Sequence, residues 1–168
     1  MRRGILFIFT VPMMLAAFVM AAPAALATSP HFISASATLN ADGSLTANFK
    51  EAGLGTNQNI DYALTADATA TYVCVNNGGA NPSAKNKTTV NGPVTATGTF
   101  SSGKNGNVVA SLTVSPPPSD ITCPSGQSLQ LASVSYANVT LTDTTNNVST
   151  SLGDFSSGCL LPNVRGAC

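Results

Sequence analysis

The sequence has no tryptophan, a single histidine (His31) and few charged residues, which make up 8% of the chain. Catalysis by a Ser or Cys nucleophile needs a base beside that nucleophile, and His31 lies just past the predicted start of the mature chain, where chain ends are commonly mobile. Lys and Arg together number 7, the same as Asp and Glu, and they do not cluster into the basic surface that nucleic acid requires. These absences lead us to expect no catalytic residues and no nucleic-acid partner.

Acidic residues are also not paired at a catalytic spacing. Asp61 and Asp67 share one face of a predicted strand, but at about 3.3 Å per residue they lie about 20 Å apart, whereas the carboxylates of glycosidases are about 5–9.5 Å apart. We expect Glu51, at a strand end near a turn, to be solvated. No calcium-binding loop pattern occurs, although a loop cluster at Asp120 or Asp143 stays as an alternative. The sequence therefore predicts no metal site and no cofactor.

A long apolar segment occurs only at the N-terminus. Arg2 and Arg3 precede an almost wholly apolar run over residues 5–20, and Ala25-Leu26-Ala27 places small residues at the −3 and −1 positions of a cut before Thr28. This order predicts a cleaved secretory signal peptide and a secreted protein of net charge −2. An uncleaved anchor is the alternative, because the run approaches the ~20 residues that span a bilayer. The small-residue cut site favours cleavage, after which no membrane span remains.

The chain contains four cysteines, all beyond the predicted cut. An even number in an exported chain predicts two disulfides, for which three pairings are possible. Our prediction is Cys74–Cys123 and Cys159–Cys168, the second pair lying close together in a Gly- and Pro-containing tail that could close on itself. A zinc site is the alternative, but no C-x-x-C pair occurs and His31 is remote in sequence.

Apolar and polar residues alternate with a period of two along most of the mature chain, as is typical of half-buried β-strands. Turn-forming pairs such as Asp42-Gly43 and Asn105-Gly106 separate the alternating segments. These segments span residues 33–39, 45–49, 60–74, 94–100, 108–114, 128–142 and 148–155. The run over 60–74 is either one long bent strand or two strands. We therefore expect an all-β, antiparallel β-sandwich, immunoglobulin-like, with seven to eight strands.

Two details refine this fold. The immunoglobulin hallmark of a core Trp against an inter-sheet disulfide is missing, so we expect the first bridge to pin the loop over residues 115–127 to a strand end. Apolar parity changes within 128–142, which predicts a bulge or burial on both faces. The predicted organisation is a signal peptide over 1–27, a β-sandwich domain over 28–158 and a short disulfide-containing tail over 159–168.

The most distinctive surface segment is a loop predicted over residues 76–92, which is rich in turn-forming Asn and Gly. Its amide and ammonium groups could bind a polar ligand; the alternative is a solvated loop with turn asparagines. The candidate binding residues are Asn76, Asn77, Asn81, Lys85 and Lys87. The three tyrosines share parity with apolar residues, so we expect them to pack in the core rather than to form an exposed sugar-stacking surface.

Four stretches of the sequence carry a family resemblance: Thr65–Gly79, Asn81–Lys87, Phe100–Gly106 and Cys123–Gln127. In these stretches the chain resembles a group of small exported proteins from soil bacteria and some fungi, and the resemblance covers most of residues 31–155. It implies no particular activity and no site residues. It does imply that Cys74 and Cys123 pair with each other.

These observations predict an exported, non-enzymatic binding or surface-interaction module whose ligand is a cell surface, a polysaccharide or a protein. The alternative is a secreted inhibitor or effector that engages a protein through the loops over 76–92 and 115–127. A third hypothesis, an enzyme, requires a convergent pair of carboxylates in a cleft.

Overall fold

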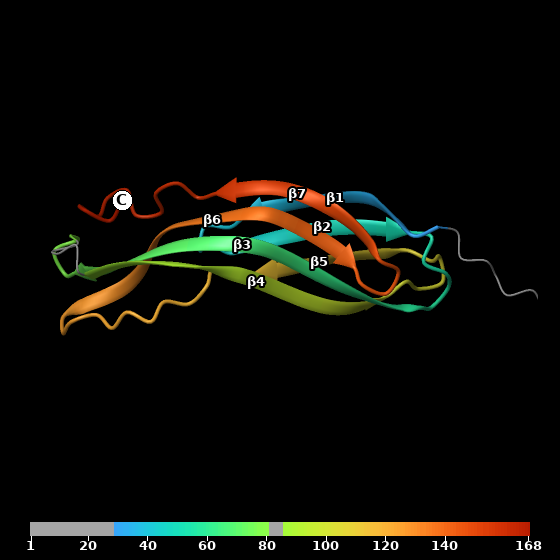
Figure 1. The fold of residues 1–168 in the computed structure, drawn as a ribbon, viewed down its shortest axis with the longest axis horizontal. Helices are drawn as coiled ribbons and strands as arrows, with labels where there is room; N and C mark the ends of the chain where they lie inside the picture. The colour runs from blue at the N-terminus through green and yellow to red at the C-terminus, as the bar shows by residue number, and fades with distance from the viewer. Residues whose placement is uncertain (1–28, 81–85) are drawn as a thin grey trace, which may run out of the picture.

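The computed structural model describes residues 29–80 and 86–168, which form two antiparallel sheets and no α-helix (Figure 1). The strands are β1 (His31–Leu39), β2 (Leu45–Ala52), β3 (Asn59–Asn76), β4 (Lys87–Ser101), β5 (Val108–Val114), β6 (Gln127–Asp143) and β7 (Val148–Ser156). One sheet has the order β1-β2-β5, and the other has the order β4-β3-β6-β7. The predicted all-β sandwich is confirmed with seven strands, because residues 60–74 lie within the single strand β3. Within the described residues, no helix is long and apolar enough to cross a membrane.

The order of the strands bears on the expected immunoglobulin-like topology. In the constant-type immunoglobulin domain the fourth strand belongs to the sheet of the first, second and fifth strands. Here β4 pairs with β3 in the other sheet, and the disulfide Cys74–Cys123 joins a strand to a loop rather than one sheet to the other. The immunoglobulin-like part of the fold expectation therefore stays a prediction.

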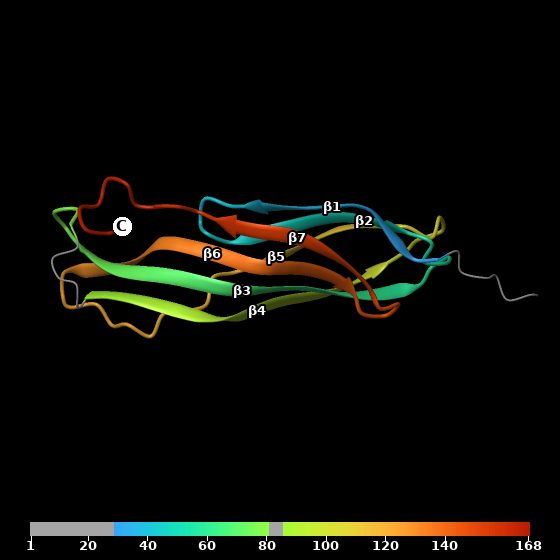
Figure 2. The same cartoon turned by 45° about the horizontal axis from the view of Figure 1, so that its top comes forward.

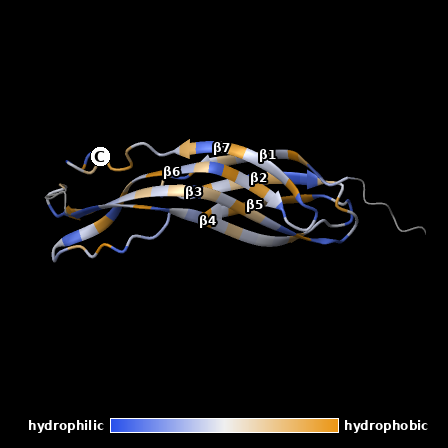
Figure 3. Cartoon of the chain, viewed as in Figure 1, coloured by the Kyte–Doolittle hydropathy of each residue, from blue (hydrophilic) through white to orange (hydrophobic). Residues whose placement is uncertain are grey.

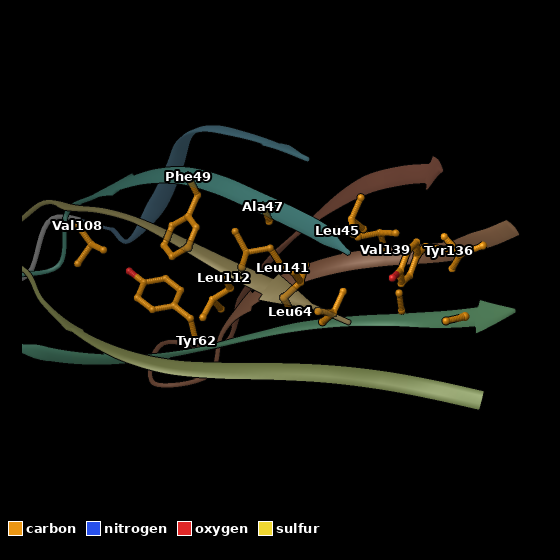
Figure 4. Close-up of a cluster of buried hydrophobic side chains, with 14 of the residues drawn as sticks. Leu45, Ala47, Phe49, Tyr62, Leu64, Val108, Leu112, Tyr136, Val139 and Leu141 are labelled. Carbon is orange, nitrogen blue, oxygen red and sulfur yellow. The ribbon is translucent and has the colours of Figure 1, made fainter. Parts of the chain in front are cut away.

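The core follows from the alternation of apolar and polar residues along the strands (Figure 3). Successive side chains of a strand point to opposite faces, so one parity of each strand is buried between the sheets. The Phe49 and Tyr62 rings meet across the sheets with their centroids 4.7 Å apart (Figure 4). The centroid of the Phe100 ring lies 5.9 Å from that of Tyr62. Tyr62 and Tyr136 are fully buried and Tyr72 is partly buried, which confirms the expected core packing of the tyrosines.

Three strands of the four-stranded sheet are much longer than the strands that face them. β3, β4 and β6 have 18, 15 and 17 residues, whereas β1, β2 and β5 have 9, 8 and 7. The long strands therefore extend past the three-stranded sheet toward the C-terminus (Figures 1 and 2). We call this extension the distal arm; it comprises Tyr72–Asn76 of β3, Lys87–Thr88 of β4 and Gln127–Leu131 of β6, which pair with one another.

Each face of the distal arm has its own cover. On one face, the loop between β5 and β6 is attached by the disulfide Cys74–Cys123 and by a hydrogen bond from the Tyr72 hydroxyl to the Pro117 carbonyl, at 2.9 Å. On the other face, the C-terminal tail packs on the arm. The apolar contacts of this second cover join Val73, Val75 and Ala132 to Leu161, Val164 and Ala167. The disulfide Cys159–Cys168 closes the tail, so both predicted pairings are confirmed, and each bridge stabilises one cover.

Two local features of the strands follow from particular residues. β4 begins at Lys87, so the loop predicted over 76–92 is wrong in its second half. Asn91-Gly92-Pro93 resembles a turn in sequence, but β4 is an edge strand, where Pro is tolerated because no neighbour needs its missing N–H. The bulge predicted within 128–142 is confirmed, since the pairing of β6 shifts between Tyr136 and Val139, where Asn138 has a φ of 56°.

Candidate functional site

The outer face of the four-stranded sheet carries rows of hydroxyl side chains that run across all four strands. Because β3 buries its even-numbered residues from 60 to 70, its odd-numbered residues and their partners on β4, β6 and β7 face outward. Three rows of register partners result: Thr97, Ala63, Thr142 and Ser149; Thr95, Thr65, Thr140 and Ser151; and Asn91, Thr69, Ser135 and Ser156. We call these twelve positions the hydroxyl face. All but Ala63 and Asn91 are Ser or Thr, and none of the twelve is buried.

The geometry of a sheet sets the spacing of this face, and the row of Pro93, Asp67 and Ala137 separates the second hydroxyl row from the third. Neighbouring strands lie about 4.7–4.9 Å apart, and residues two apart along a strand are separated by about 6.6 Å. Side chains on such a face therefore form a two-dimensional array of donors and acceptors, because a Ser or Thr hydroxyl can act as both. No ring and no cation occurs at the twelve positions.

A groove adjoins the hydroxyl face where the C-terminal tail crosses the sheet. Its volume is about 360 Å³, and its walls include Thr69, Ser135 and Ser156 of the hydroxyl face together with both cysteines of the tail bridge. The Lys87 ammonium also lines the groove, but it donates a hydrogen bond to the Ala167 carbonyl at 2.8 Å. Five of the eleven residues that line the groove are Ser or Thr, and its one ammonium group holds the tail in place.

Two carboxylates near the hydroxyl face are held by a single asparagine. The backbone N–H of Asn138 donates to Asp154 and its side-chain amide donates to Asp67, both at 2.9 Å. Asp61, farther along β3, accepts a hydrogen bond from Thr99 at 2.6 Å. Asp61 and Asp67 are thus exposed and bound to different partners. All three carboxylates give the outer face a negative charge.

The candidate binding residues of the predicted loop have structural contacts of their own. The Asn76 side-chain carbonyl accepts the backbone N–H groups of Gly78 and Ala80, both at 3.0 Å, which closes the turn after β3. Asn77 is exposed at the tip of that turn. Lys87 binds the tail, as described above. Asn81 and Lys85 lie outside the described residues, so these predictions remain predictions.

A second cluster, of acidic groups, is buried at the opposite end of the sandwich and was missed in the sequence. Glu51 of β2 and Asp143 of β6 have no exposed surface, and Tyr62 of β3 has 1% exposed. The expectation that Glu51 is solvated is wrong. Its parity could have revealed the burial, because Glu51 follows Leu45, Ala47 and Phe49 on the inward face of β2.

The environment of Glu51 disfavours a charge. Neither carboxylate oxygen of Glu51 has a hydrogen-bond partner within the described residues, and the same is true of the Tyr62 hydroxyl. Burial raises the pKa of Glu51 to about 7; the Tyr62 phenol opposes this shift, Asp143 adds to it and His31 weakly opposes it. The two carboxyls approach each other, yet neither lines the groove beside the tail or the cleft near the adjoining turn.

Two further results bear on identity and chemistry. Within residues 29–80 and 86–168, no group of three or more His, Cys, Asp or Glu side chains is arranged to hold a metal ion. The chain matches no protein-family model, and neither a search of curated proteins nor a search of solved structures gives a match. The resemblance to small exported proteins therefore stays a prediction.

Proposed function

We propose that the protein is a secreted, non-enzymatic module that binds an uncharged polysaccharide on its hydroxyl face. The observation that carries this proposal is the hydroxyl face, on which ten of twelve positions across β4, β3, β6 and β7 are Ser or Thr, together with the adjoining groove. Sugar hydroxyls donate and accept hydrogen bonds, as do Ser and Thr hydroxyls. A polymer also repeats along its length, so one chain could contact several of the rows.

Charge and contact number define the class of polymer. The carboxylates Asp61, Asp67 and Asp154 would repel an anionic polymer, and the Lys87 ammonium is engaged by the tail. Each hydroxyl contact with a sugar replaces a contact with water, so its net contribution is only about 0.5–1.5 kcal/mol. Useful affinity therefore requires many repeated contacts along one chain, as in multivalent binding. An insoluble neutral glycan offers such repetition.

Export is the other part of the proposal. Two disulfides suit an oxidising compartment such as the extracellular space. The sequence pattern of the first 27 residues supports a cleaved signal peptide. A protein released in this way would meet cell-wall and environmental polysaccharides directly.

A binding assay with matched variants tests the proposal. The secreted protein is incubated with insoluble cellulose and with chitin, and the bound fraction is measured against protein concentration. The variant Thr65→Val, Thr69→Val, Thr95→Val removes three hydroxyls while keeping β-branched side chains of nearly the same shape. Its control, Thr38→Val, Thr46→Val, Thr113→Val, removes one row of hydroxyls from the outer face of the three-stranded sheet.

We expect the wild type and the control to bind at least one polymer, and the hydroxyl-face variant to bind at least tenfold more weakly. Equal binding by both variants would place the contact elsewhere on the molecule. Failure of the wild type to bind either polymer would count against a neutral glycan as the ligand.

A second candidate function is an inhibitor or effector that engages a protein through the tips of the distal arm. The observation that favours it is that the turn over residues 77–80 and the loop over 115–127 lie at the same end of the molecule, which is closed by Cys74–Cys123 and by a hydrogen bond from Asn86 to Gln127 at 3.0 Å. Affinity capture with the secreted protein would identify one stoichiometric protein partner if this function is correct. The same capture repeated with Asn77→Arg and Ser125→Arg, both at exposed tips, would then lose that partner.

A further inference from the structure

The buried acidic cluster joins the two sheets at the end opposite the C-terminal tail. Glu51 belongs to the three-stranded sheet, whereas Asp143 and Tyr62 are direct register partners in the four-stranded sheet. Figure 4 shows the Tyr62 hydroxyl pointing to the side of Val108, which is the register partner of Glu51 on β5. The cluster therefore spans the core between the sheets.

Elementary electrostatics decides the protonation state of this cluster. An unpaired carboxylate removed from water costs several kcal/mol, and a second carboxylate nearby adds repulsion. Glu51 receives no hydrogen bond from the described residues, whereas Asp143 accepts two. The low-energy arrangement therefore has one proton on Glu51 and a charge on Asp143. A proton on Glu51 removes the negative charge that this buried, unpartnered carboxyl would otherwise carry.

Asp143 also connects the cluster to the surface. Its two carboxylate oxygens accept the backbone N–H of Asn146 at 2.9 Å and the Asn146 side-chain amide at 2.7 Å. Asn146 in turn lines a cleft of about 460 Å³, and the other lining residues are Thr145, 54–56 and 58–60. Any displacement of the Asp143 carboxylate therefore changes one wall of this cleft.

We infer that Glu51 and Asp143 form a proton-dependent lock between the sheets, which holds the turn over residues 144–147 and the adjoining cleft in shape while Glu51 is protonated and loosens them when Glu51 ionises. The groups that face Glu51 are Asp143 from β6, Tyr62 from β3 and His31 from β1. Among them only Asp143 carries a negative charge, so ionisation of Glu51 creates a repelling pair. This lock is independent of the ligand proposed for the hydroxyl face.

The sign of the effect follows from proton linkage. Glu51 has an ordinary pKa of 4.5 in the unfolded chain, and burial raises its pKa to about 7 in the folded protein. The folded state thus binds the extra proton between these two values, and its stabilisation is complete below pH 4.5 and is lost as the pH rises through about 7. Linkage allows the unfolding equilibrium constant to rise on the order of a hundredfold over this interval.

The chain offers an unusually direct test, because Glu51 is its only glutamate. Selective ¹³C labelling of glutamate gives a single carboxyl resonance in the NMR spectrum of the wild-type secreted protein. We expect this resonance to titrate with a midpoint near 7 and the Asn146 side-chain amide to shift with the same midpoint. A Glu51 midpoint near 4.5, or an Asn146 amide that does not follow Glu51, would overturn the inference.

Urea unfolding at pH 5 and pH 8 provides a second readout. The wild type should lose stability between these values, whereas Glu51→Gln should lose much less because its side chain is neutral at both. Asp120→Asn, which removes an exposed carboxylate, is the control and should keep the wild-type dependence. An unchanged dependence in Glu51→Gln would refute the lock. The NMR titration uses the wild type, so it decides the question even where a variant does not fold.

Discussion

Tyr136 shows how single side chains connect the layers of this sandwich. Its hydroxyl, buried in the core, donates a hydrogen bond of 2.7 Å to the Gly43 carbonyl in the turn between β1 and β2. That turn needs glycine, because Gly43 has a φ of 85° and a Cβ there would lie 2.4 Å from Leu131 Cδ2. The backbone of one sheet thus fits closely against side chains of the other.

The first prediction concerns this bond. Tyr136→Phe should lower the free energy of unfolding by about 1–3 kcal/mol, because it leaves a buried carbonyl without its donor. Tyr72→Phe is the control: its partner, the Pro117 carbonyl, belongs to a part-buried contact, so water can replace the lost donor and the loss should be smaller. Urea unfolding measures both. Equal losses of unfolding free energy in the two variants would show that burial of the carbonyl does not determine how much the lost hydrogen bond destabilises the protein.

Some of the buried side chains could be predicted from the sequence, and others could not. The buried tyrosines were visible from parity, and so was the shared strand face of Asp61 and Asp67. Glu51 was misread because charge was given more weight than parity, although its position on β2 continues an inward series. Its partner Asp143 could not be found, because that contact depends on how two sheets pack and not on any local pattern.

At the scale of elements, the distal arm is held between two covers, and each cover has one disulfide. The Cys74–Cys123 bridge closes a separation of 49 residues, whereas Cys159–Cys168 closes a separation of 9. In the chain-entropy description a longer closed loop gives a larger stabilisation, on the order of 4 kcal/mol for the first bridge and about 3 kcal/mol for the second. The two bridges should therefore differ in what their removal does.

The second prediction separates the two covers. Cys74→Ser, Cys123→Ser should lower the melting temperature more than Cys159→Ser, Cys168→Ser. The second variant should mainly release the tail from Val73, Val75 and Ala132. Trypsin should then cut after the exposed Arg165 much faster than in the wild type, with the shortened product seen by mass spectrometry. Unchanged cleavage at Arg165 would mean that packing alone holds the tail.

The elements themselves were largely predictable, with one instructive exception. Alternation located all seven strands, and the change of parity located the bulge of β6. The start of β4 was missed because Asn91-Gly92-Pro93 has the composition of a turn. Whether such a segment turns or continues as a strand depends on the strand beside it. β4 continues because it pairs along its whole length with β3. Its other edge is unpaired, so Pro93 removes no ladder hydrogen bond there. The hydroxyl face likewise required the register between strands, which no single strand contains.

At the scale of the whole molecule, oxidation and architecture depend on each other. The distal arm extends past the three-stranded sheet, so its apolar residues rely on covers that are themselves closed by disulfides. Such bridges persist in an oxidising compartment and are rare in the cytosol. Among the described residues no cysteine is free, so in the fully oxidised chain every cysteine is part of a disulfide. In a reducing compartment both disulfides would be absent, so the β5–β6 loop and the C-terminal tail should be held less firmly on the distal arm.

The third prediction joins these points in one measurement. The protein recovered from the medium should begin at Thr28, and its intact mass should fall below that of reduced residues 28–168 by two hydrogens for each of its two bridges. Alkylation without reductant should add nothing, whereas alkylation after reduction should modify all four cysteines. The full-length chain expressed without secretion is the comparison, and we expect it to take up alkylating reagent before reduction. A product that keeps residues 1–27 would indicate the uncleaved anchor, and free thiols in the secreted protein would contradict the link between export and the covers of the distal arm.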